Sequence, residues 1–399
     1  MKNRSGNFSA LFPLFFTAFI DFIGFGIIIP IAPYYAQKLG ASPFEFSMLL
    51  VAYSVSQLVM SPILGSLSDR YGRKKILITG LLGEIAGYII FASAPSLVFL
   101  FLGRIISGGT SANLTVIYSM VSDRTDPERR TKAIGIIGAA IGMGFVIGPA
   151  TGGILSFLGF RTVIYLTSLL SLTNLLLVLR LRESRSMFPA LGMNFLREVS
   201  SAVRRGRSLF LGLVFVGMGF AIMQATLAYY GEHLFGWASL EVGIVLLILG
   251  LEQAVFQFLL ISYISKKAGE IRASEFAMIF FSLGFLILFA TPGEYFVLGG
   301  LTLLNFGYSL FQTPVISILS QRSSAARGAT LGISQSATSL ANTVGPGIGG
   351  FLFGAVSIGS PYLVSAIFGI IAALTIIVFK NSSTKKARPD ENIRIPCDV

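Results

Sequence analysis

Charged side chains are scarce in this sequence of 399 residues. They make up 12% of the chain, about half of the roughly 25% found in soluble globular domains. Apolar residues account for 54%, and the mean hydropathy is +0.78. A soluble globule could not hide so much apolar surface, and a disordered chain would be far more polar. The composition therefore indicates a protein with many membrane spans.

Cysteine and histidine are nearly absent. The chain has one of each, Cys397 near its end and His233 in a predicted loop. A single cysteine excludes an intrachain disulfide and a cysteine-based metal centre. An intramembrane enzyme would need a nucleophile with a base, or metal ligands, and no His-Glu-x-x-His motif is present. We therefore expect no enzymatic activity, no cofactor and no metal site.

Long apolar runs fill most of the chain, and a membrane-spanning helix needs about 20 such residues. The sequence predicts an all-α membrane protein with twelve transmembrane helices. The predicted spans are 10–32, 46–66, 76–95, 97–121, 133–157, 162–181, 208–231, 240–264, 275–291, 295–319, 329–356 and 361–380.

The net charge of +12 reports topology rather than nucleic-acid binding. Nearly all of the 30 lysines and arginines fall in the loops that share a side with the N-terminus. The opposite side has Lys38 and Arg161, and Arg104 lies within a span. Because cytoplasmic loops carry an excess of basic residues, both termini and the middle loop are predicted to be cytoplasmic. The lipid bilayer is the expected surrounding, and no nucleic-acid partner is expected.

The two halves of the chain repeat each other. A shift of 197 residues places the Gly-Pro-x-x-Gly-Gly of 148–153 on that of 345–350. We predict a bundle at 1–181, a cytoplasmic loop at 182–207, a second bundle at 208–380 and a disordered cytoplasmic tail at 381–399. Two parallel halves with a central site are a transporter architecture.

Three motifs carry a family resemblance. The loop after the second span reads Gly65-Ser-Leu-Ser-Asp69-Arg70-Tyr-Gly72-Arg73, the fourth span contains Arg104-x-x-x-Gly108, and the fifth contains Gly144-x-x-x-Gly148-Pro149-x-x-Gly152-Gly153. Together with Asp21-x-x-Gly24-x-Gly26-x-x-x-Pro30 in the first span, they resemble the major facilitator superfamily. More narrowly, they resemble its twelve-span drug:proton antiporters, which include tetracycline exporters.

The resemblance implies two pseudo-symmetric six-helix bundles in the cell membrane. It also implies a secondary active transporter that exports small lipophilic or cationic molecules in exchange for protons, by alternating access and as a monomer. A metabolite, sugar or lipid permease on the same fold, working as a symporter or a facilitator, stays open as the alternative. A non-transporting scaffold or receptor is a further alternative, which the two intact halves disfavour.

Four ionisable residues inside the predicted spans are candidates for proton coupling: Asp21, Glu84, Arg104 and Glu252. An intramembrane charge costs about 2.5–3.5 kcal/mol even on the mild scale. Asp21 and Arg104 lie at similar depth, so they form either a proton site or a static ion pair. Glu84 has no obvious local partner and either couples protons, binds a substrate cation or faces a wet crevice; tetracycline exporters carry an acid one turn further along, where this chain has Gly87. Glu252 is a candidate second protonation site.

The loop motif is predicted to gate the transporter through Gly65, Asp69, Arg70, Gly72 and Arg73. Asp69 could accept hydrogen bonds from a helix N-terminus, and the resemblance implies that the loop latches the two halves in the outward-open state. The alternative is a topology signal alone.

In the fifth span, Gly144, Gly148 and Gly152 form a small-residue face for close helix packing, and Pro149 can kink that helix. The resemblance implies that this seam, which includes Gly153, controls exchange.

Polar side chains at helical spacing are predicted to form the substrate-binding wall, because polar groups at membrane depth face the bundle interior or water. Interhelical hydrogen bonding is the alternative for each of them. The candidates are Gln224 in the seventh span, Asn305, Tyr308 and Gln312 in the tenth, and Gln335 and Asn342 in the eleventh.

Overall fold

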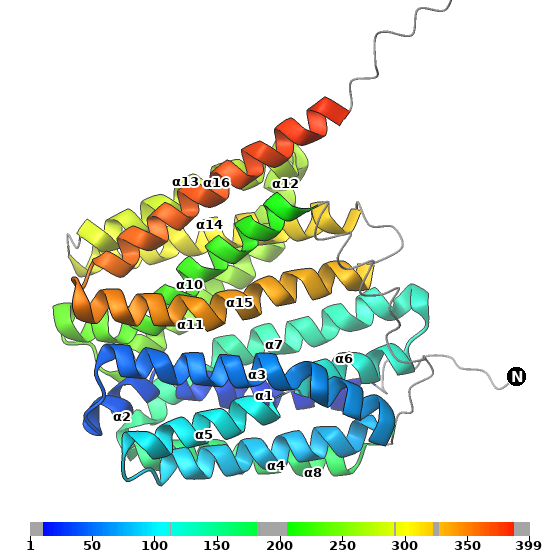
Figure 1. Cartoon of the computed structure of the whole chain (residues 1–399), viewed down its shortest axis with the longest axis vertical. Helices are drawn as coiled ribbons and strands as arrows, with labels where there is room; N and C mark the ends of the chain where they lie inside the picture. The colour runs from blue at the N-terminus through cyan, green and yellow to red at the C-terminus, as the bar shows by residue number, and fades with distance from the viewer. Residues whose placement is uncertain are drawn as a thin grey trace, which may run out of the picture.

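The computed structural model describes residues 11–111, 113–181, 183, 206–290, 293–321 and 327–386. Within these residues the chain is helical, and the long helices run side by side (Figure 1). The predicted disordered tail at 381–399 falls largely outside the described residues, and the helix before it continues to Lys386.

The first half of the chain supplies six membrane-crossing segments. They are α1 (Phe12–Ile28) with α2 (Ala32–Lys38), α3 (Pro43–Tyr71), α4 (Arg73–Ala92), α5 (Leu97–Thr110) with α6 (Asn113–Arg124), α7 (Pro127–Leu155) followed by the short η2 (Ser156–Leu158), and α8 (Phe160–Leu179). The axes of α1 and α2 differ by 42°. Pro30 stands at this bend, because proline lacks the N–H that would continue the helix.

The second half supplies six more. They are α10 (Arg207–Phe235), α11 (Ser239–Val255) continued by the π-helical η3 (Phe256–Ile261) and α12 (Ser262–Ala268), α13 (Glu270–Ala290), α14 (Glu294–Gln321), α15 (Arg327–Ala355) and α16 (Ser360–Lys386). The twelve predicted helices are therefore confirmed, and most extend beyond the predicted spans.

Most of these helices are long and apolar enough to cross a bilayer. By length and composition, nine of the described helices pass that test, or ten when α1 and α2 count as one span. Many large apolar side chains point away from the bundle, among them Val98 on α5, Phe296 on α14 and Leu259 in η3. Many exposed apolar side chains of this kind are expected where lipid, not water, surrounds the protein.

The internal repeat is visible in the backbone. Gly72 joins α3 to α4 with φ of 107°, and Gly269 joins α12 to α13 with φ of 83°. These two glycines are 197 residues apart, the same shift that aligns the two sequence motifs. Both adopt a left-handed conformation that a residue with a Cβ atom rarely takes, so glycine is needed at each turn.

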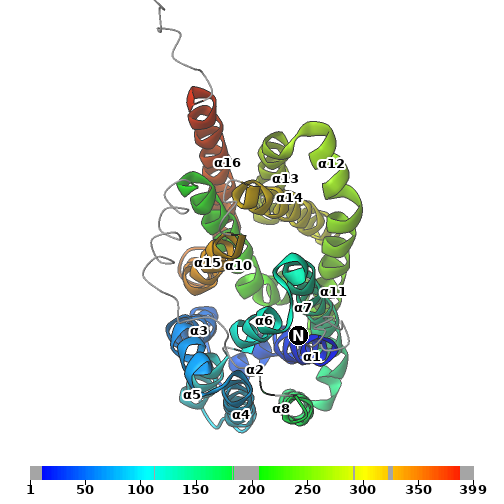
Figure 2. The same ribbon diagram turned by 90° about the vertical axis from the view of Figure 1, so that its right-hand side faces the viewer.

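Two helix pairs join the halves: α3 packs against α15, and α7 packs against α11. Viewed along the helices, α1 to α8 form one group and α10 to α16 the other (Figure 2). The contacts at one end are close. There the Tyr34 hydroxyl of α2 donates to the Trp237 carbonyl at 2.9 Å, and the Tyr229 hydroxyl of α10 donates to the Pro33 carbonyl at 3.4 Å. We call this the α2 end, and the opposite end the Gly72 end.

The cores of the halves follow the same division. Near the α2 end, a buried cluster around Tyr35 and Phe91 includes Tyr229 from the second half. Near the Gly72 end, the cluster around Leu77, Val121 and Val178 contains first-half residues alone, within the described part of the chain. The two halves are thus packed together at the α2 end.

Candidate functional site

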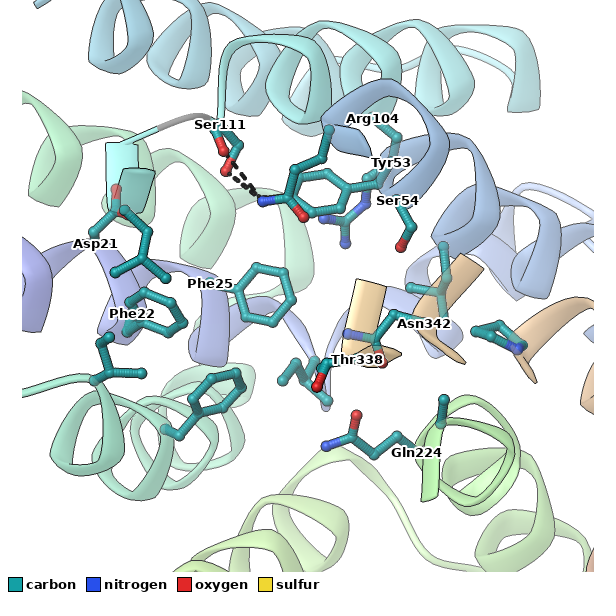
Figure 3. Close-up of a pocket in the computed structure, with 18 of the residues that line it drawn as sticks. Asp21, Phe22, Phe25, Tyr53, Ser54, Arg104, Ser111, Gln224, Thr338 and Asn342 are labelled. Carbon is teal, nitrogen blue, oxygen red and sulfur yellow. Dashed lines mark hydrogen bonds between the residues drawn. The ribbon is translucent and has the colours of Figure 1, made fainter. Parts of the chain in front are cut away.

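A cavity of about 440 Å³ lies between the two halves. Helices α1, α3, α4, α5, α6 and α7 line it from the first half, and α10 and α15 from the second (Figure 3). Its aromatic wall includes Phe22, Phe25, Phe46, Tyr53 and Phe145. Among the described residues, the carboxyl and guanidinium groups that line it belong to Asp21, Glu84 and Arg104, and all three come from the first half.

Asp21 and Glu84 form a pair of carboxyl groups at this cavity. The Asn113 amide, at the first residue of α6, donates to Asp21 Oδ1 at 3.0 Å and to Glu84 Oε2 at 3.2 Å. The Ser171 hydroxyl donates to Glu84 Oε1 at 3.3 Å, and the two carboxyl groups are within hydrogen-bonding reach of each other. Two like charges this close repel, so the pair can hold a proton between its two members.

Arg104 does not pair with Asp21, so the static ion pair, one of the two alternatives for these residues, is absent from the described structure. The guanidinium lies instead between aromatic rings, with its Cζ atom 4.9 Å from the centre of the Phe91 ring and 5.8 Å from that of Tyr53. No ion pair of Arg104 occurs among the described residues, and its buried Nε has no hydrogen-bond partner. Asp21 and Arg104 lie on different sides of the cavity (Figure 3).

The packing of α4 on α5 explains where Arg104 lies. A Cβ atom on Gly87 would lie 2.8 Å from the Gly103 carbonyl oxygen and 2.8 Å from Ser107 Cβ. A side chain at position 87 would therefore require α4 and α5 to move apart, and the glycine at this position supplies no carboxylate to Arg104.

Glu252 lies outside the central cavity. The Thr302 hydroxyl donates to its Oε1 at 2.7 Å, and the Asn305 amide donates to its Oε2 at 3.4 Å and to the Leu249 carbonyl at 2.7 Å. The π-helical η3 begins four residues after Glu252, and π-helical turns are frequent at functional sites. A protonation role for Glu252 stays a prediction.

The loop motif is tied to its own half. The buried Arg73 side chain pairs with Asp123 at the end of α6, and its Nη2 lies 3.0 Å from Asp69 Oδ1. The Glu183 carboxylate accepts from the Lys74 backbone N–H at 3.0 Å, at the start of α4. Arg70 lies 5.4 Å from the Tyr71 ring centre, and Gly65 faces Thr115. Asp69 therefore contacts a neighbouring arginine rather than the expected helix N-terminus, and gating by this loop stays a prediction.

The glycine face of α7 packs closely on α1. A Cβ atom on Gly148 would lie 2.8 Å from Gly26 Cα, and one on Gly144 would lie 2.7 Å from Phe22 Cβ. Gly152 similarly meets the backbone of Ile27. Helix α7 runs unbroken through Pro149.

Gly153 faces the other half of the molecule. A Cβ atom there would lie 2.9 Å from the Ser239 carbonyl oxygen and 3.0 Å from Gly243 Cα, both of α11. Its repeat counterpart, Gly350 of α15, lies against Pro43 and Ser47 of α3. In both helix pairs that join the halves, the last glycine of the Gly-Pro-x-x-Gly-Gly motif therefore makes a close contact with the partner helix.

Some of the residues predicted to form the substrate-binding wall line the cavity and others do not. Gln224 and Asn342 line the cavity, beside Thr338 (Figure 3). Tyr308 is hydrogen-bonded to Gln312, and its ring stacks on Phe220 with the ring centres 4.2 Å apart. The Asn305 amide donates a hydrogen bond to Glu252. None of these last three lines the cavity. The side chain of Gln335 lies outside the described residues.

Sequence reasoning missed several polar residues of the site. Asn113, which bridges the carboxyl pair, is 2% exposed. Ser111 accepts from the Tyr53 hydroxyl at 2.8 Å and from the Gln57 amide at 3.2 Å. An available signal was the polar stretch Thr110-Ser-Ala-Asn113 inside an otherwise apolar span. In the described part of the chain, no cluster of three His, Cys, Asp or Glu residues could hold a metal ion.

Comparisons with known proteins agree with this architecture. The chain is 32% identical to the tetracycline resistance protein, class E, of Escherichia coli over 84% of this chain and 86% of that one. It is 27% identical to multidrug resistance protein 2 of Bacillus subtilis (strain 168), over 92% and 94% of the two chains.

A bacterial homologue of the human lysosomal transporter Spinster, solved in an inward-facing and unoccupied conformation, superposes with a TM-score of 0.75 at 17% identity. That match covers 97% of this chain and 100% of the other. The profile of the Major Facilitator Superfamily matches residues 14–273 and 209–397. This chain, a multi-span membrane transporter of small molecules, therefore belongs to the Major Facilitator Superfamily.

Proposed function

We propose that this protein is a proton-coupled exporter of small amphipathic molecules, working as a monomer in the cell membrane. Its relatives include multidrug and tetracycline resistance proteins, which favours export over uptake. The observation that carries the proposal is the bridged carboxyl pair of Asp21 and Glu84 at the central cavity.

The pair suits proton exchange because its charge depends on its surroundings. With a proton, Asp21 and Glu84 together carry one negative charge; without it, two repelling charges lie beside an apolar, aromatic cavity. A cavity open to one side of the membrane at a time would load the pair on one side and release the proton on the other.

The orientation of the chain determines which side of the membrane each end of the cavity faces. The basic loops at the Gly72 end favour the cytoplasm for that end, and the halves meet at the α2 end. The structure would then be closed toward the outside. In a Cys397→Ser background, Lys38→Cys should react with an impermeant maleimide in intact cells, whereas Lys75→Cys should react only after permeabilisation. The reverse pattern would contradict this orientation.

Proton coupling is tested in proteoliposomes with an imposed pH gradient. A driving force of about 150 mV contributes roughly 3.5 kcal/mol per proton, at about 2.3 kcal/mol per 100 mV. That supports a substrate gradient of about 300- to 400-fold. Asp21→Asn and Glu84→Gln should each abolish this accumulation while leaving downhill exchange measurable.

Asp126→Asn is the matched control. Asp126 is an exposed carboxylate before α7, and its side chain makes no capping hydrogen bond. This variant should accumulate substrate as the unmodified protein does. Accumulation that persists in the Asp21→Asn and Glu84→Gln double variant would refute the role of the pair.

A further inference from the structure

The Arg104 guanidinium is an unpaired positive charge beside the cavity. The residue is 5% exposed, and no aspartate or glutamate of the described chain forms an ion pair with it. Its Nε is fully buried and has no hydrogen-bond acceptor. A buried cation without an anionic partner is costly, and such residues inside spans generally pair with something.

Among the described residues, no aspartate or glutamate supplies that partner. Asp21 and Glu84 share Asn113 and each other instead. The nearby hydroxyl and amide groups of Tyr53 and Gln57 donate to Ser111. The rings of Phe91 and Tyr53 offset part of the charge of Arg104, but they accept none of its N–H donors.

We propose that Arg104 is the anion-binding subsite of this cavity and that preferred substrates are aromatic carboxylates, including zwitterions. The planar guanidinium binds a carboxylate through two parallel hydrogen bonds. Tyr53, Phe25 and Phe145 supply the wall for the attached ring. In a zwitterion, the positive group lies toward Asp21, on the other side of the cavity (Figure 3), where Asn113 bridges Asp21 to Glu84.

This inference deepens the proposed function, on which it rests for the cavity being the transport site. It narrows the substrate class, because a purely cationic lipophile would add a second positive charge near Arg104. A substrate carboxylate would instead neutralise that charge.

Binding to the purified full-length protein tests the inference. The probes are a rhodamine with a free carboxylate and its ethyl ester, which differ by one negative charge. The unmodified protein should bind the carboxylate about tenfold or more tightly than the ester, since hydrogen bonds to charged groups are among the stronger ones. Arg104→Gln should abolish this preference, and Arg104→Lys should retain part of it.

Arg180→Gln is the matched control, because Arg180 is an exposed arginine at the end of α8. It should keep the preference for the carboxylate. Thermal unfolding checks that each variant is folded, and Arg104→Lys keeps the test informative if Arg104→Gln fails to fold. Equal binding of the two probes, a preference for the ester, or no binding of the carboxylate would each overturn the assignment.

Transport separates this inference from the proposed function. If a pH gradient drives accumulation of the ester but Arg104 confers no preference for the carboxylate, the exporter stands and the anion subsite fails. If the carboxylate binds in an Arg104-dependent way but no pH gradient moves either probe, the subsite stands and proton coupling fails.

Discussion

Gly153→Ala should open the molecule at the α2 end. The added Cβ atom would lie 2.9 Å from the Ser239 carbonyl oxygen, 3.0 Å from Gly243 Cα and 3.2 Å from the Leu240 carbonyl oxygen. All three neighbours are backbone atoms of α11, so no side-chain rotation relieves the contact. Ordinary contacts of a Cβ atom begin at 3.4 Å, so α11 must recede by about half an ångström.

The added methyl group destabilises only the conformation that is closed at the α2 end. Overpacking of this kind costs about 1–3 kcal/mol, and only the state in which α7 and α11 meet at this point carries it. The equilibrium should therefore move by about 5- to 150-fold toward the state open at the α2 end. Gly350→Ala, at the repeat-related interface, should move it in the same direction.

Pulsed electron paramagnetic resonance measures the shift. Spin labels at Lys38→Cys and Ser357→Cys, in the Cys397→Ser background, report the separation of the two halves at the α2 end. Gly142→Ala is the control on the same helix, because a Cβ atom there meets nothing within 4 Å. Identical distance distributions for Gly153→Ala and Gly142→Ala would refute the reasoning.

Three further outcomes are expected. Asp69→Asn should cut transport at least tenfold while leaving protein abundance near normal, because a surface loop biases two global states at little folding cost; unchanged transport would leave the loop as a topology signal. Asp123→Asn should lower the free energy of unfolding by about 1.5–3 kcal/mol, because it removes one of the two carboxylates that pair with the buried Arg73 and leaves Asp69 in place; thermal unfolding measures this. Glu252→Gln should lower the number of protons exchanged per substrate, read from the reversal potential in proteoliposomes; an unchanged potential would assign Glu252 to bonding with Thr302.

The helices were predictable because the bilayer constrains them strongly. Apolar runs of about 20 residues mark spans, and the repeat motif around Pro149 and Pro346 marks equivalent helices of the two halves. The interruptions were less predictable. Pro30 signals the bend between α1 and α2, but no proline or glycine lies within the π-helical segment Phe256–Ile261 to signal it.

The sequence predicted how deep in the membrane the site residues lie, but not which neighbours their side chains face. Counting residues placed Asp21 and Arg104 at a similar level in the membrane, and both line the cavity. Counting does not give the face on which each side chain lies. That depends on how closely α5 approaches α4 at Gly87, a long-range packing result that one sequence does not contain. Glu84 consequently takes the place beside Asp21 that the sequence suggested for Arg104.

The unequal composition of the cavity wall has an evolutionary consequence. Within the described lining, the first half contributes the carboxyl and guanidinium groups, whereas the second half contributes neutral groups such as Gln224, Thr338 and Asn342. Mutations in the second half can therefore change which compounds fit the cavity without altering the carboxyl groups proposed to bind protons. Such a division allows relatives to diverge in what they carry while retaining the same energy source.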